Sequence, residues 1–369
     1  MIKPIIIDLI AGARPNFMKI APIIHAISKL KNNKIQFRLI HTGQHYDINM
    51  SSVFFKELEI PNPDINLNAG SGSQAEQSAA IMIGYEKVLN VSKPDLCLVV
   101  GDVTSTMSCA IVARKMQVPV AHVEGGIRSG DWSMPEEINR IVTDSISNYF
   151  FTTTKNACNN LEKTGVNKKS IFFVGNTMID TLLKNRLKFS KPKIWEKLGL
   201  KEKEYIIITL HRPANVDETE NFTKIIAEII ANSRELPLIF PVHPRTLKVI
   251  NISGISHPRL HLIEPLGYLE FNYLVNRSKV VITDSGGITE ETTVLGIPCI
   301  TLRDNTERPE TVKIGTNKLI GTNPKAIKPT LDLLFSNKWK KGKIPEKWDG
   351  HTSERILNHI INIFQINQL

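Results

Sequence analysis

Acidic side chains and histidines recur where short apolar runs of the sequence end. Asp102, Glu124 and His211 each follow directly on such a run, and His122 and His243 have equivalent settings. Carboxylates and imidazoles whose pKa values are shifted by their surroundings carry general acid–base catalysis. The convergence of several such groups favours proton-transfer chemistry over a set of unrelated surface charges.

Two further segments contain residue types that bind anions. Arg14 lies in a predicted turn and Lys19 about one helical turn later, so both can reach an anion at the start of a helix. In the string DSGGITEE, Asp284 ends a predicted strand, a glycine pair follows, and a helix is expected from Ile288. The exposed N–H groups and helix dipole of such a turn suit a phosphate or pyrophosphate. For Arg14 and Lys19, the alternative to an anion site is that both are solvated surface cations. For the glycine turn, the alternative is a tight strand-to-helix turn with Ser285 as the N-cap.

Several carboxylates are expected in the loops beyond the strands. Glu136 and Arg140 are four residues apart on a predicted helix, where a simple i,i+4 ion pair is the alternative to a catalytic role. Glu290 and Glu291 are expected in the first turn of their helix, with one of them directed toward sugar hydroxyls. The carboxylates assigned to the cleft are Asp102, Glu124, Asp131, Glu136 and Glu137.

These groups are positioned by an alternation of β-branched runs and longer amphipathic segments. Strands are predicted at 4–11, 36–41, 95–101, 118–123, 149–153, 171–174, 205–210, 237–242, 260–263, 279–283 and 297–302. Helices are predicted at 20–31, 75–91, 104–116, 135–147, 221–233, 288–295 and 353–364. Apolar strands that alternate with helices indicate α/β domains with parallel sheets covered on both faces. Ligands of such sheets bind beyond the carboxyl ends of the strands, so two facing domains would form one cleft.

The chain length of 369 residues fits two domains, and a charged stretch at 184–203 is predicted to connect them at the surface. The predicted division is residues 1–176, joined by a closing helix at 354–369, and residues 177–353.

Composition and missing motifs exclude several functions. Lys and Arg exceed Asp and Glu by 46 to 36, but aromatic residues are only 7% and do not interleave with the cations, which argues against a nucleic-acid platform. The chain lacks the P-loop pattern, G-x-G-x-x-G after the first strand, and H-E-x-x-H, which argues against ATP hydrolysis, dinucleotide redox chemistry and a metal site. The excess positive charge is interpreted as attraction of an anionic substrate or as neutral drift.

The four cysteines form no C-x-x-C pair, and two lie inside apolar runs, so a reducing cytoplasm is expected rather than a disulfide framework. The first apolar stretch is interrupted by Asp8 too soon for a signal peptide, and no run has the length of a membrane span.

Taken together, the motifs resemble the non-hydrolysing UDP-N-acetylglucosamine 2-epimerase family. The matching strings occur in order along almost the whole chain: GARPNFMKIAP, HTGQHYD, GDVTST, HVEGGIRS, MPEEINR, VGNTMID, TLHR, DSGGITEE and LRDNTERPE. The resemblance implies a glycosyltransferase-B-like fold of two Rossmann-like domains with a central cleft and a final helix that crosses back to the first domain. It also implies interconversion of UDP-GlcNAc and UDP-ManNAc for polysaccharide biosynthesis, without metal or nicotinamide, by a cytoplasmic homodimer.

The same resemblance assigns roles to individual residues. The implied catalytic set is Asp102, Glu124, Glu136 and His211, with no acid assigned to either face of the sugar. The implied substrate-binding set is Arg14, Lys19, Gln44, His45, Arg140, His243, Ser285, Gly286, Gly287, Glu291 and Arg308. Within that set, Arg14 and Lys19 match residues near the diphosphate, Ser285–Gly287 match a phosphate turn, and Glu291 matches an acid that holds ribose hydroxyls.

Three departures from the family pattern bear on specificity. The string HRPAN at 211–215 lacks the acid of the family's H-R-x-E-N, and Ala80 stands where regulated bacterial members have an arginine that touches a second substrate molecule. The GARP string with a downstream phenylalanine also resembles epimerases of UDP-2,3-diacetamido-glucuronate. Two competing hypotheses are a glycosyltransferase of the same fold and a non-catalytic nucleotide-sugar binder, although a binder has no need of three acids beside a diphosphate.

Overall fold

The computed structural model describes residues 4–30, 34–43, 55–242 and 244–364. The chain forms two compact units, residues 1–184 with 346–369, and residues 185–345. The division thus falls eight residues after the position expected from the sequence. Helix α7 (Thr177–Asn185) accounts for the difference, because the Thr181 hydroxyl donates to the Met18 carbonyl oxygen at 2.6 Å and holds α7 in the first unit.

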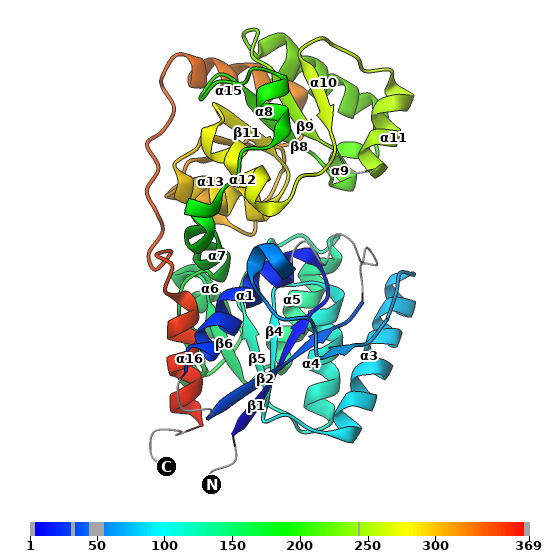
Figure 1. Ribbon diagram of the computed structural model, residues 1–369, viewed down its shortest axis with the longest axis vertical. Coiled ribbons are helices and arrows are strands. Elements are labelled where there is room, and N and C mark those ends of the chain that lie inside the picture. Colours follow the sequence, from blue (N-terminus) through cyan, green and yellow to red (C-terminus); the bar gives the residue numbers. More distant parts are fainter. Residues whose placement is uncertain (1–3, 31–33, 44–54, 243, 365–369) are drawn as a thin grey trace. The chain divides into compact units, whose positions relative to one another are not determined.

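The first unit contains a seven-stranded parallel sheet in the order β3-β2-β1-β4-β5-β6-β7. Helices cover both faces of the sheet (Figure 1). The strands are β1 Ile5–Ala11, β2 Ile35–His41, β3 Ile65–Asn66, β4 Leu96–Val100, β5 Val120–Val123, β6 Tyr149–Thr152 and β7 Ile171–Phe173. Besides α7, the structure describes the helices α1 Arg14–Ser28, α3 Gln74–Val91, α4 Thr104–Lys115, α5 Pro135–Ile146, α6 Lys155–Lys163 and α16 Thr352–Ile363, with helical residues at 55–58 and a 3-10 turn at Lys168–Ser170.

The second unit contains a six-stranded parallel sheet in the order β10-β9-β8-β11-β12-β13. Its strands are β8 Ile206–Thr209, β9 Leu238–Pro241, β10 Leu260–Ile263, β11 Val280–Thr283, β12 Cys299–Thr301 and β13 Asn317–Leu319. Its helices are α8 Lys193–Lys197, α9 Pro213–Val216, α10 Thr219–Asn232, α11 Pro244–Ser253, α12 Tyr268–Arg277, α13 Gly286–Leu295, α14 Pro309–Lys313 and α15 Ile327–Phe335, with 3-10 turns at Arg186–Lys188 and Pro324–Ala326. Together the two sheets confirm the expected α/β class.

The apolar runs of the sequence became the central strands for a simple physical reason. Every residue of β4 is buried, as is every residue of β5 and β11, because helices cover both faces of each sheet. The sequence missed β3 and β13, which have two and three residues and stand at sheet edges. Runs this short are below the length at which a hydrophobic pattern identifies a strand.

Several helices begin at residues other than those expected. Helix α1 begins at Arg14, six residues before the predicted start, so Arg14 lies inside the helix rather than in the turn. Helix α13 begins at Gly286, which places Glu290 and Glu291 in its second turn rather than its first. The charged stretch at 184–203 is not only a surface connection, because it contains α8, whose Trp195 ring lies edge-on to Tyr205 at 5.7 Å.

The closing helix α16 belongs to the first unit and lies beside α1 (Figure 1). The Asp180 carboxylate of α7 accepts the backbone N–H groups of Thr352 and Ser353 at 3.0 and 2.7 Å, at the start of α16. Nearby, the buried Trp348 indole donates to the Thr153 carbonyl oxygen at 3.1 Å. A carboxylate at a helix N-terminus satisfies orphan N–H groups and complements the helix dipole.

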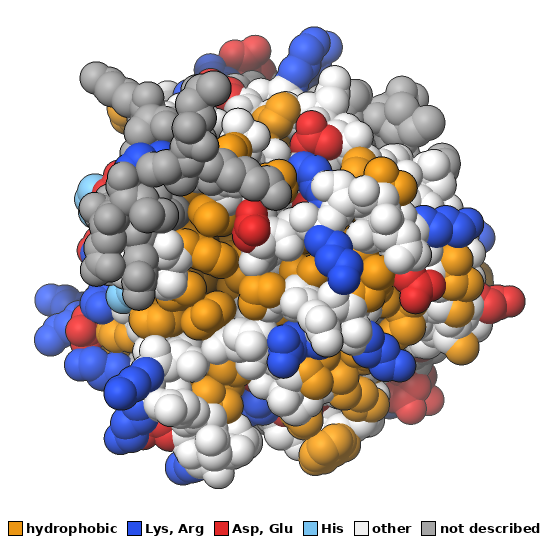
Figure 2. Space-filling view, turned by 90° about the horizontal axis from the view of Figure 1, so that it is seen from below, with side chains coloured by type: hydrophobic (Ala, Val, Ile, Leu, Met, Phe, Trp, Pro, Cys, Tyr) orange, Lys and Arg blue, Asp and Glu red, His pale blue; other side chains and the backbone are white. Residues whose placement is uncertain are grey.

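On the face shown in Figure 2, the Lys and Arg side chains near the centre are separated by hydrophobic and uncharged ones, and several others lie closer together at the lower left. No helix of the described residues has the length and apolar character needed to cross a membrane. All four cysteines are unpaired thiols, and Cys97, Cys109 and Cys299 are buried.

Candidate active site

The first turn of the first unit is held in place by an asparagine from the start of α1. Asn16 Oδ1 accepts the backbone N–H groups of Gly12 and Ala13 at 3.1 and 3.0 Å, while its Nδ2 donates to the Val100 carbonyl oxygen at 3.1 Å. The end of β1 is thereby tied to the end of β4. This arrangement sets the direction in which α1, and with it Lys19, leaves the sheet.

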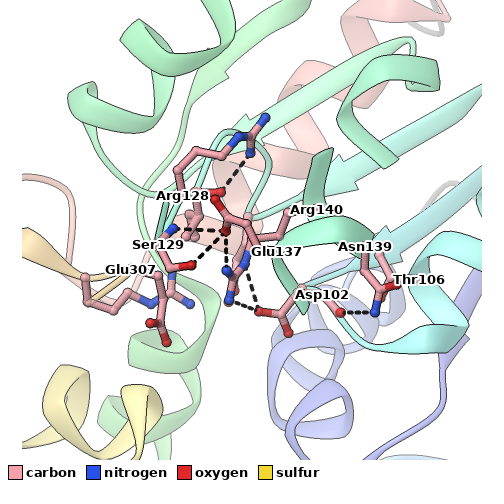
Figure 3. A network of polar contacts seen from close by, with 12 residues as sticks. Asp102, Thr106, Arg128, Ser129, Glu137, Asn139, Arg140 and Glu307 are labelled. Carbon is pink, nitrogen blue, oxygen red and sulfur yellow. Dashed lines mark hydrogen bonds and ion pairs between the residues drawn. The ribbon is translucent and has the colours of Figure 1, made fainter. Parts of the chain in front are cut away.

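Asp102, at the carboxyl end of β4, is held by an arginine from α5 (Figure 3). Arg140 donates to Asp102 Oδ2 through Nε at 3.0 Å and through Nη2 at 2.6 Å, and to Glu137 Oε2 through Nη1 at 2.7 Å. The Arg140 side chain is buried, whereas that of Asp102 is about one-quarter exposed at 26%. Asp102 is therefore a partly exposed carboxylate whose orientation is fixed by the buried Arg140 guanidinium.

The acid that Arg140 contacts on α5 is Glu137, not Glu136. Glu137 also accepts the Ser129 backbone N–H and hydroxyl at 3.0 and 3.1 Å and the Gly130 N–H at 3.0 Å. Burial opposes its ionisation, but these N–H groups and Arg140 outweigh that effect and lower the pKa of Glu137. Arg140 therefore pairs with Glu137 at i,i+3 instead of forming the i,i+4 pair with Glu136 that was the alternative to a catalytic role, because both spacings share a helix face and the Ser129 loop holds Glu137 in place. Glu136 is half-buried.

Glu124 follows β5 and forms a buried ion pair with Lys19 of α1. Lys19 Nζ lies 2.8 Å from Glu124 Oε2, and both side chains are less than 10% exposed. Glu124 has a φ of 72°, in the left-handed region that costs a side-chain-bearing residue energy. Its N–H donates to the Phe151 carbonyl oxygen at 2.9 Å, which fixes this conformation. A cation expected at the diphosphate and a candidate proton acceptor are thus in direct contact.

His122 differs from His211, although the sequence gives both histidines equivalent positions near the end of a strand. Its ring is completely buried within β5, and its Nδ1 and Nε2 lie 2.7 Å from Asp144 Oδ1 and 2.8 Å from the Gly101 carbonyl oxygen. His122 therefore has no access to a substrate, whereas the side chain of His211 in the second unit is 56% exposed.

In the second unit, His211 at the end of β8 is oriented by a buried carboxylate. Its Nδ1 lies 2.9 Å from Asp284 Oδ1. Asp284 Oδ2 also accepts the N–H groups of His211 and Arg212 at 3.0 and 2.9 Å and Asn215 Nδ2 at 3.1 Å. Burial by itself would raise the pKa of Asp284. The hydrogen bond and charge of His211, together with the other donors, have the larger effect, so the pKa of Asp284 is lowered overall. An ionised Asp284 holds the Nδ1 proton of His211 and leaves Nε2 for chemistry.

The start of α13 has the predicted glycine turn, whereas the alternative, a cap made by the Ser285 side chain, is absent. Ser285 occupies the N-cap position without a side-chain cap hydrogen bond, and its N–H donates to Thr283 Oγ1 at 3.0 Å. A Cβ on Gly286 would lie 2.5 Å from Glu307 Oε1, so a larger residue there requires the Glu307 side chain to move. Gly287 forms the second position of the helix. The helix start thus matches the geometry of an anion site.

Two acids of α13 are buried with partners. Glu290 Oε1 lies 2.6 Å from Arg308 Nε, and Glu291 Oε1 accepts the Tyr268 hydroxyl at 2.9 Å. Burial and the neighbouring Glu291 raise the pKa of Tyr268. Tyr268 remains a hydrogen-bond donor that fixes one Glu291 oxygen. Sequence reasoning missed Tyr268, which comes from α12 and has no motif to mark it.

Some expected site residues are outside what the structure describes. Gln44, His45 and His243 are not among the described residues, and for Arg14 only the backbone position in α1 is described. Among residues 4–30, 34–43, 55–242 and 244–364, no group of three or more His, Cys, Asp or Glu side chains is arranged to hold a metal ion. Asp144 and Asp284 as partners of histidines were also missed, because their roles depend on residues far away in the sequence.

Comparison with known sequences gives one consistent match. A sequence model of the family described as UDP-N-acetylglucosamine 2-epimerase matches residues 28–361. The curated UDP-N-acetylglucosamine 2-epimerase of Methanocaldococcus jannaschii is 42% identical over 362 residues, or 95% of this chain and 97% of that protein. The UDP-2,3-diacetamido-2,3-dideoxy-D-glucuronate 2-epimerase of Pseudomonas aeruginosa is 40% identical over 318 residues, or 85% of this chain and 87% of that protein.

Solved structures agree with the sequence matches. The crystal structure of the Methanocaldococcus jannaschii UDP-GlcNAc 2-epimerase in complex with UDP-GlcNAc and UDP aligns with a TM-score of 0.86 at 41% identity, covering 96% of this chain and 100% of that one. The Neisseria meningitidis UDP-GlcNAc 2-epimerase bound to UDP-GlcNAc aligns with a TM-score of 0.89 at 31% identity, covering 97% and 100%.

Proposed function

This chain belongs to the UDP-N-acetylglucosamine 2-epimerase family, and from that premise we propose that it interconverts UDP-N-acetylglucosamine and UDP-N-acetylmannosamine. The observation that carries the proposal is a pair of strand-end carboxylates in the first unit, each beside a buried cation. Asp102 lies 2.6 Å from Arg140, and Glu124 lies 2.8 Å from Lys19. Such groups move a proton while remaining fixed in place.

The reaction balances without an external reactant. A carboxylate removes the proton at C2 of the sugar while the C1–O bond breaks and UDP leaves with its electron pair, giving a 2-acetamidoglucal. An oxygen of the UDP diphosphate then adds back to C1, and a proton is delivered to C2 on the opposite face. Cations that stabilise the departing diphosphate lower the barrier of both half-reactions, because negative charge develops on it as the C1–O bond lengthens toward the transition state.

We assign the acids and bases as follows. Asp102 and Glu124 are the carboxylates with cationic support, and Glu136 is the third candidate of the set, with no face of C2 assigned to any of them. His211 acts through Nε2, since Nδ1 is directed at Asp284. Arg140 keeps Asp102 in one orientation through two hydrogen bonds, which limits the reorganisation needed during proton transfer.

The remaining proposed residues bind the nucleotide. Arg14, Lys19 and the start of α13 at Ser285, Gly286 and Gly287 take the diphosphate, and Glu291 takes the ribose hydroxyls with its other oxygen held by Tyr268. The further proposed contacts are Gln44, His45, Arg140, His243 and Arg308.

A second substrate has support from a specific observation. The Pseudomonas aeruginosa relative at 40% identity acts, by its name, on a UDP-2,3-diacetamido-glucuronate, and the GARP string is similar to such enzymes. The proton abstraction at C2 and the loss of UDP are the same for both sugars. The two proposals differ only in the groups at C3 and C6 of the sugar.

The deciding experiment is proton NMR of each UDP-sugar incubated with the protein in D2O without added metal. Loss of the C2 proton signal together with growth of the 2-epimer's anomeric signal supports the proposal. Asp102→Asn and Glu124→Gln are expected to abolish the exchange, and Glu86→Gln, an exposed carboxylate on α3, serves as the control. Binding of both sugars without exchange favours a non-catalytic binder. Release of UDP that requires an added acceptor favours a glycosyltransferase.

We further propose that the protein is a homodimer in the cytoplasm and that its product feeds polysaccharide synthesis. Dimerisation and pathway rest on the family resemblance. The four unpaired cysteines support a reducing compartment. Sedimentation equilibrium tests the dimer directly, and a monomer at all concentrations would exclude it.

A further inference from the structure

His122 lies completely buried at the end of β5, between two hydrogen-bond acceptors. Its Nδ1 is 2.7 Å from Asp144 Oδ1 on α5, and its Nε2 is 2.8 Å from the carbonyl oxygen of Gly101 at the end of β4. Neither distance leaves room for a bridging water. Both partners are therefore bonded to the ring directly.

The two partners determine how many protons the ring carries. A neutral imidazole has one N–H donor and one acceptor nitrogen, and a backbone carbonyl oxygen is an acceptor only. The other nitrogen then faces the Asp144 carboxylate, whose second oxygen accepts the Gly126 N–H at 3.0 Å and Arg128 Nη1 at 2.6 Å. Burial opposes ionisation of Asp144, but His122 and Arg128 outweigh it and lower the pKa of Asp144. An ionised Asp144 is an acceptor as well, so both ring nitrogens of His122 donate.

We propose that His122 is a positioning residue whose two ring N–H groups hold together the two turns carrying Asp102 and Glu124. Its Nε2–H fixes the Gly101 carbonyl, one residue before Asp102. Its Nδ1–H fixes Asp144, whose other oxygen fixes the Gly126 N–H, two residues after Glu124. A neutral ring would donate to only one of these turns, so the second proton is what joins them.

The backbone conformation of the two turns explains why they need the hydrogen bonds of His122 and Asp144. Gly101, Glu124 and Gly126 all have positive φ values, 68°, 72° and 82°. Turns of this kind keep their shape only when surrounding contacts determine it. The charged groups facing the ring are Asp144 from α5 and, through that carboxylate, Arg128 from the loop after β5, while the β4 side presents a neutral carbonyl. One carboxylate thus lies between two cations, which keeps the buried imidazolium compensated.

This inference rests on the proposed function for the roles of Asp102 and Glu124, but its protonation half does not. The first measurement is ring ¹⁵N NMR of the full chain labelled in histidine, with the His122 signals assigned by their loss in His122→Gln. At neutral pH, both His122 nitrogens are expected to give the signals of protonated ring nitrogens, because each faces a hydrogen-bond acceptor. A pattern with a single protonated nitrogen would overturn the proposal. If His122→Gln does not fold, Asp144→Asn identifies the same signals, because it changes the group bonded to His122 Nδ1.

The second measurement tests positioning. Glutamine offers one amide donor group in place of two ring N–H donors in opposite directions, so His122→Gln is expected to lower kcat for C2 proton exchange at least about tenfold with a smaller change in KM. His359→Gln is the control, because the His359 ring packs on the Phe172 ring, with the two ring centroids 4.4 Å apart, and not on either turn. An unchanged kcat in His122→Gln, or an equal loss in His359→Gln, would overturn the positioning role.

The two proposals fail in different ways. If the wild-type chain exchanges neither UDP-sugar, the proposed function fails while the ring ¹⁵N result still stands. Positioning is then judged from the amide signals of Gly101 and Gly126. Both are expected to shift in His122→Gln and in Asp144→Asn, and a shift at only one of the two glycines would show that the ring does not join the turns.

Discussion

Asp284→Asn tests whether a buried carboxylate sets the protonated nitrogen of His211. The carboxylate accepts from His211 Nδ1 at 2.9 Å, from the N–H groups of His211 and Arg212, and from Asn215 Nδ2. An asparagine at this position has one acceptor oxygen and one donor NH2 group. If the oxygen keeps Arg212 and Asn215, the NH2 group faces His211 and favours the tautomer with its proton on Nε2, the nitrogen proposed to react.

The size of the effect follows from the lost hydrogen bonds. A bond to an ionised group contributes roughly 1.5–3 kcal/mol and a neutral one about 1 kcal/mol, so converting these bonds and misdirecting one or two of them costs on the order of 2–4 kcal/mol of folding stability. General acid–base catalysis by one group contributes about 10²–10⁴-fold, which sets the upper limit for loss of His211 function. We expect kcat to fall on the order of 10²-fold, equivalent to about 2.7 kcal/mol of transition-state stabilisation.

The assay is the initial rate of C2 deuterium exchange, measured for Asp284→Asn, His211→Asn and the double variant. If Asp284 acts through His211, the double variant is no slower than His211→Asn alone. Asn215→Ala is the matched control, because it removes a donor to Asp284 and weakens the same turn without changing the group that faces the imidazole. Multiplicative losses in the double variant, or an equal loss of kcat in Asn215→Ala, would refute the argument that Asp284 sets the tautomer.

Three further perturbations have defined outcomes. The pKa of Glu137 is lowered in the folded chain from a reference of 4.5, so the stability that its carboxylate contributes is complete above that reference and is lost as the pH falls through the lower folded value. Glu137→Gln is therefore expected to lower the free energy of unfolding in urea by roughly 2–3 kcal/mol at neutral pH and by less in acid. A loss that grows in acid would contradict this. Gly126→Ala places a Cβ 2.3 Å from the Ala157 carbonyl oxygen at a φ of 82°, whereas the Cβ of the control Gly165→Ala, at a φ of 88°, meets open space. Gly126→Ala is expected to lower the free energy of unfolding by at least about 2 kcal/mol more than Gly165→Ala does. Equal losses in the two variants would show that the contact relaxes freely. Lys19→Met is expected to reduce kcat/KM for exchange by roughly 10²-fold, and unchanged kinetics would remove Lys19 from the site.

Much of the site follows from local sequence. The runs that became β4, β5, β8 and β11 are four or five residues long, and a chemistry-bearing residue lies within two positions of the end of each, at Asp102, Glu124, His211 and Asp284. Parallel strands expose the backbone beyond their carboxyl ends, where side chains have room to meet a ligand. Alternating runs and the ordered motif strings therefore predict the α/β class, the family and most members of the candidate set.

What the sequence alone misassigned are the partners of those groups. Glu136 and Glu137 are equally compatible with Arg140 by helical spacing, and the loop at Ser129 and Gly130 decides for Glu137. His122 and His211 have the same local pattern, yet one is completely buried and the other is 56% exposed.

By itself, then, the sequence determined which residues stand at strand ends and to which family the chain belongs, because hydrophobic runs and motif strings are local properties. Only the tertiary structure decided that Asp144 and Asp284 hold the two histidines, and that Lys19 contacts Glu124 across 105 positions of the chain. The protonation and orientation of these side chains depend on the acceptors and charges that folding brings within about 3 Å of them. Residues that meet in this way are far apart in the sequence, so the local sequence does not predict the contact.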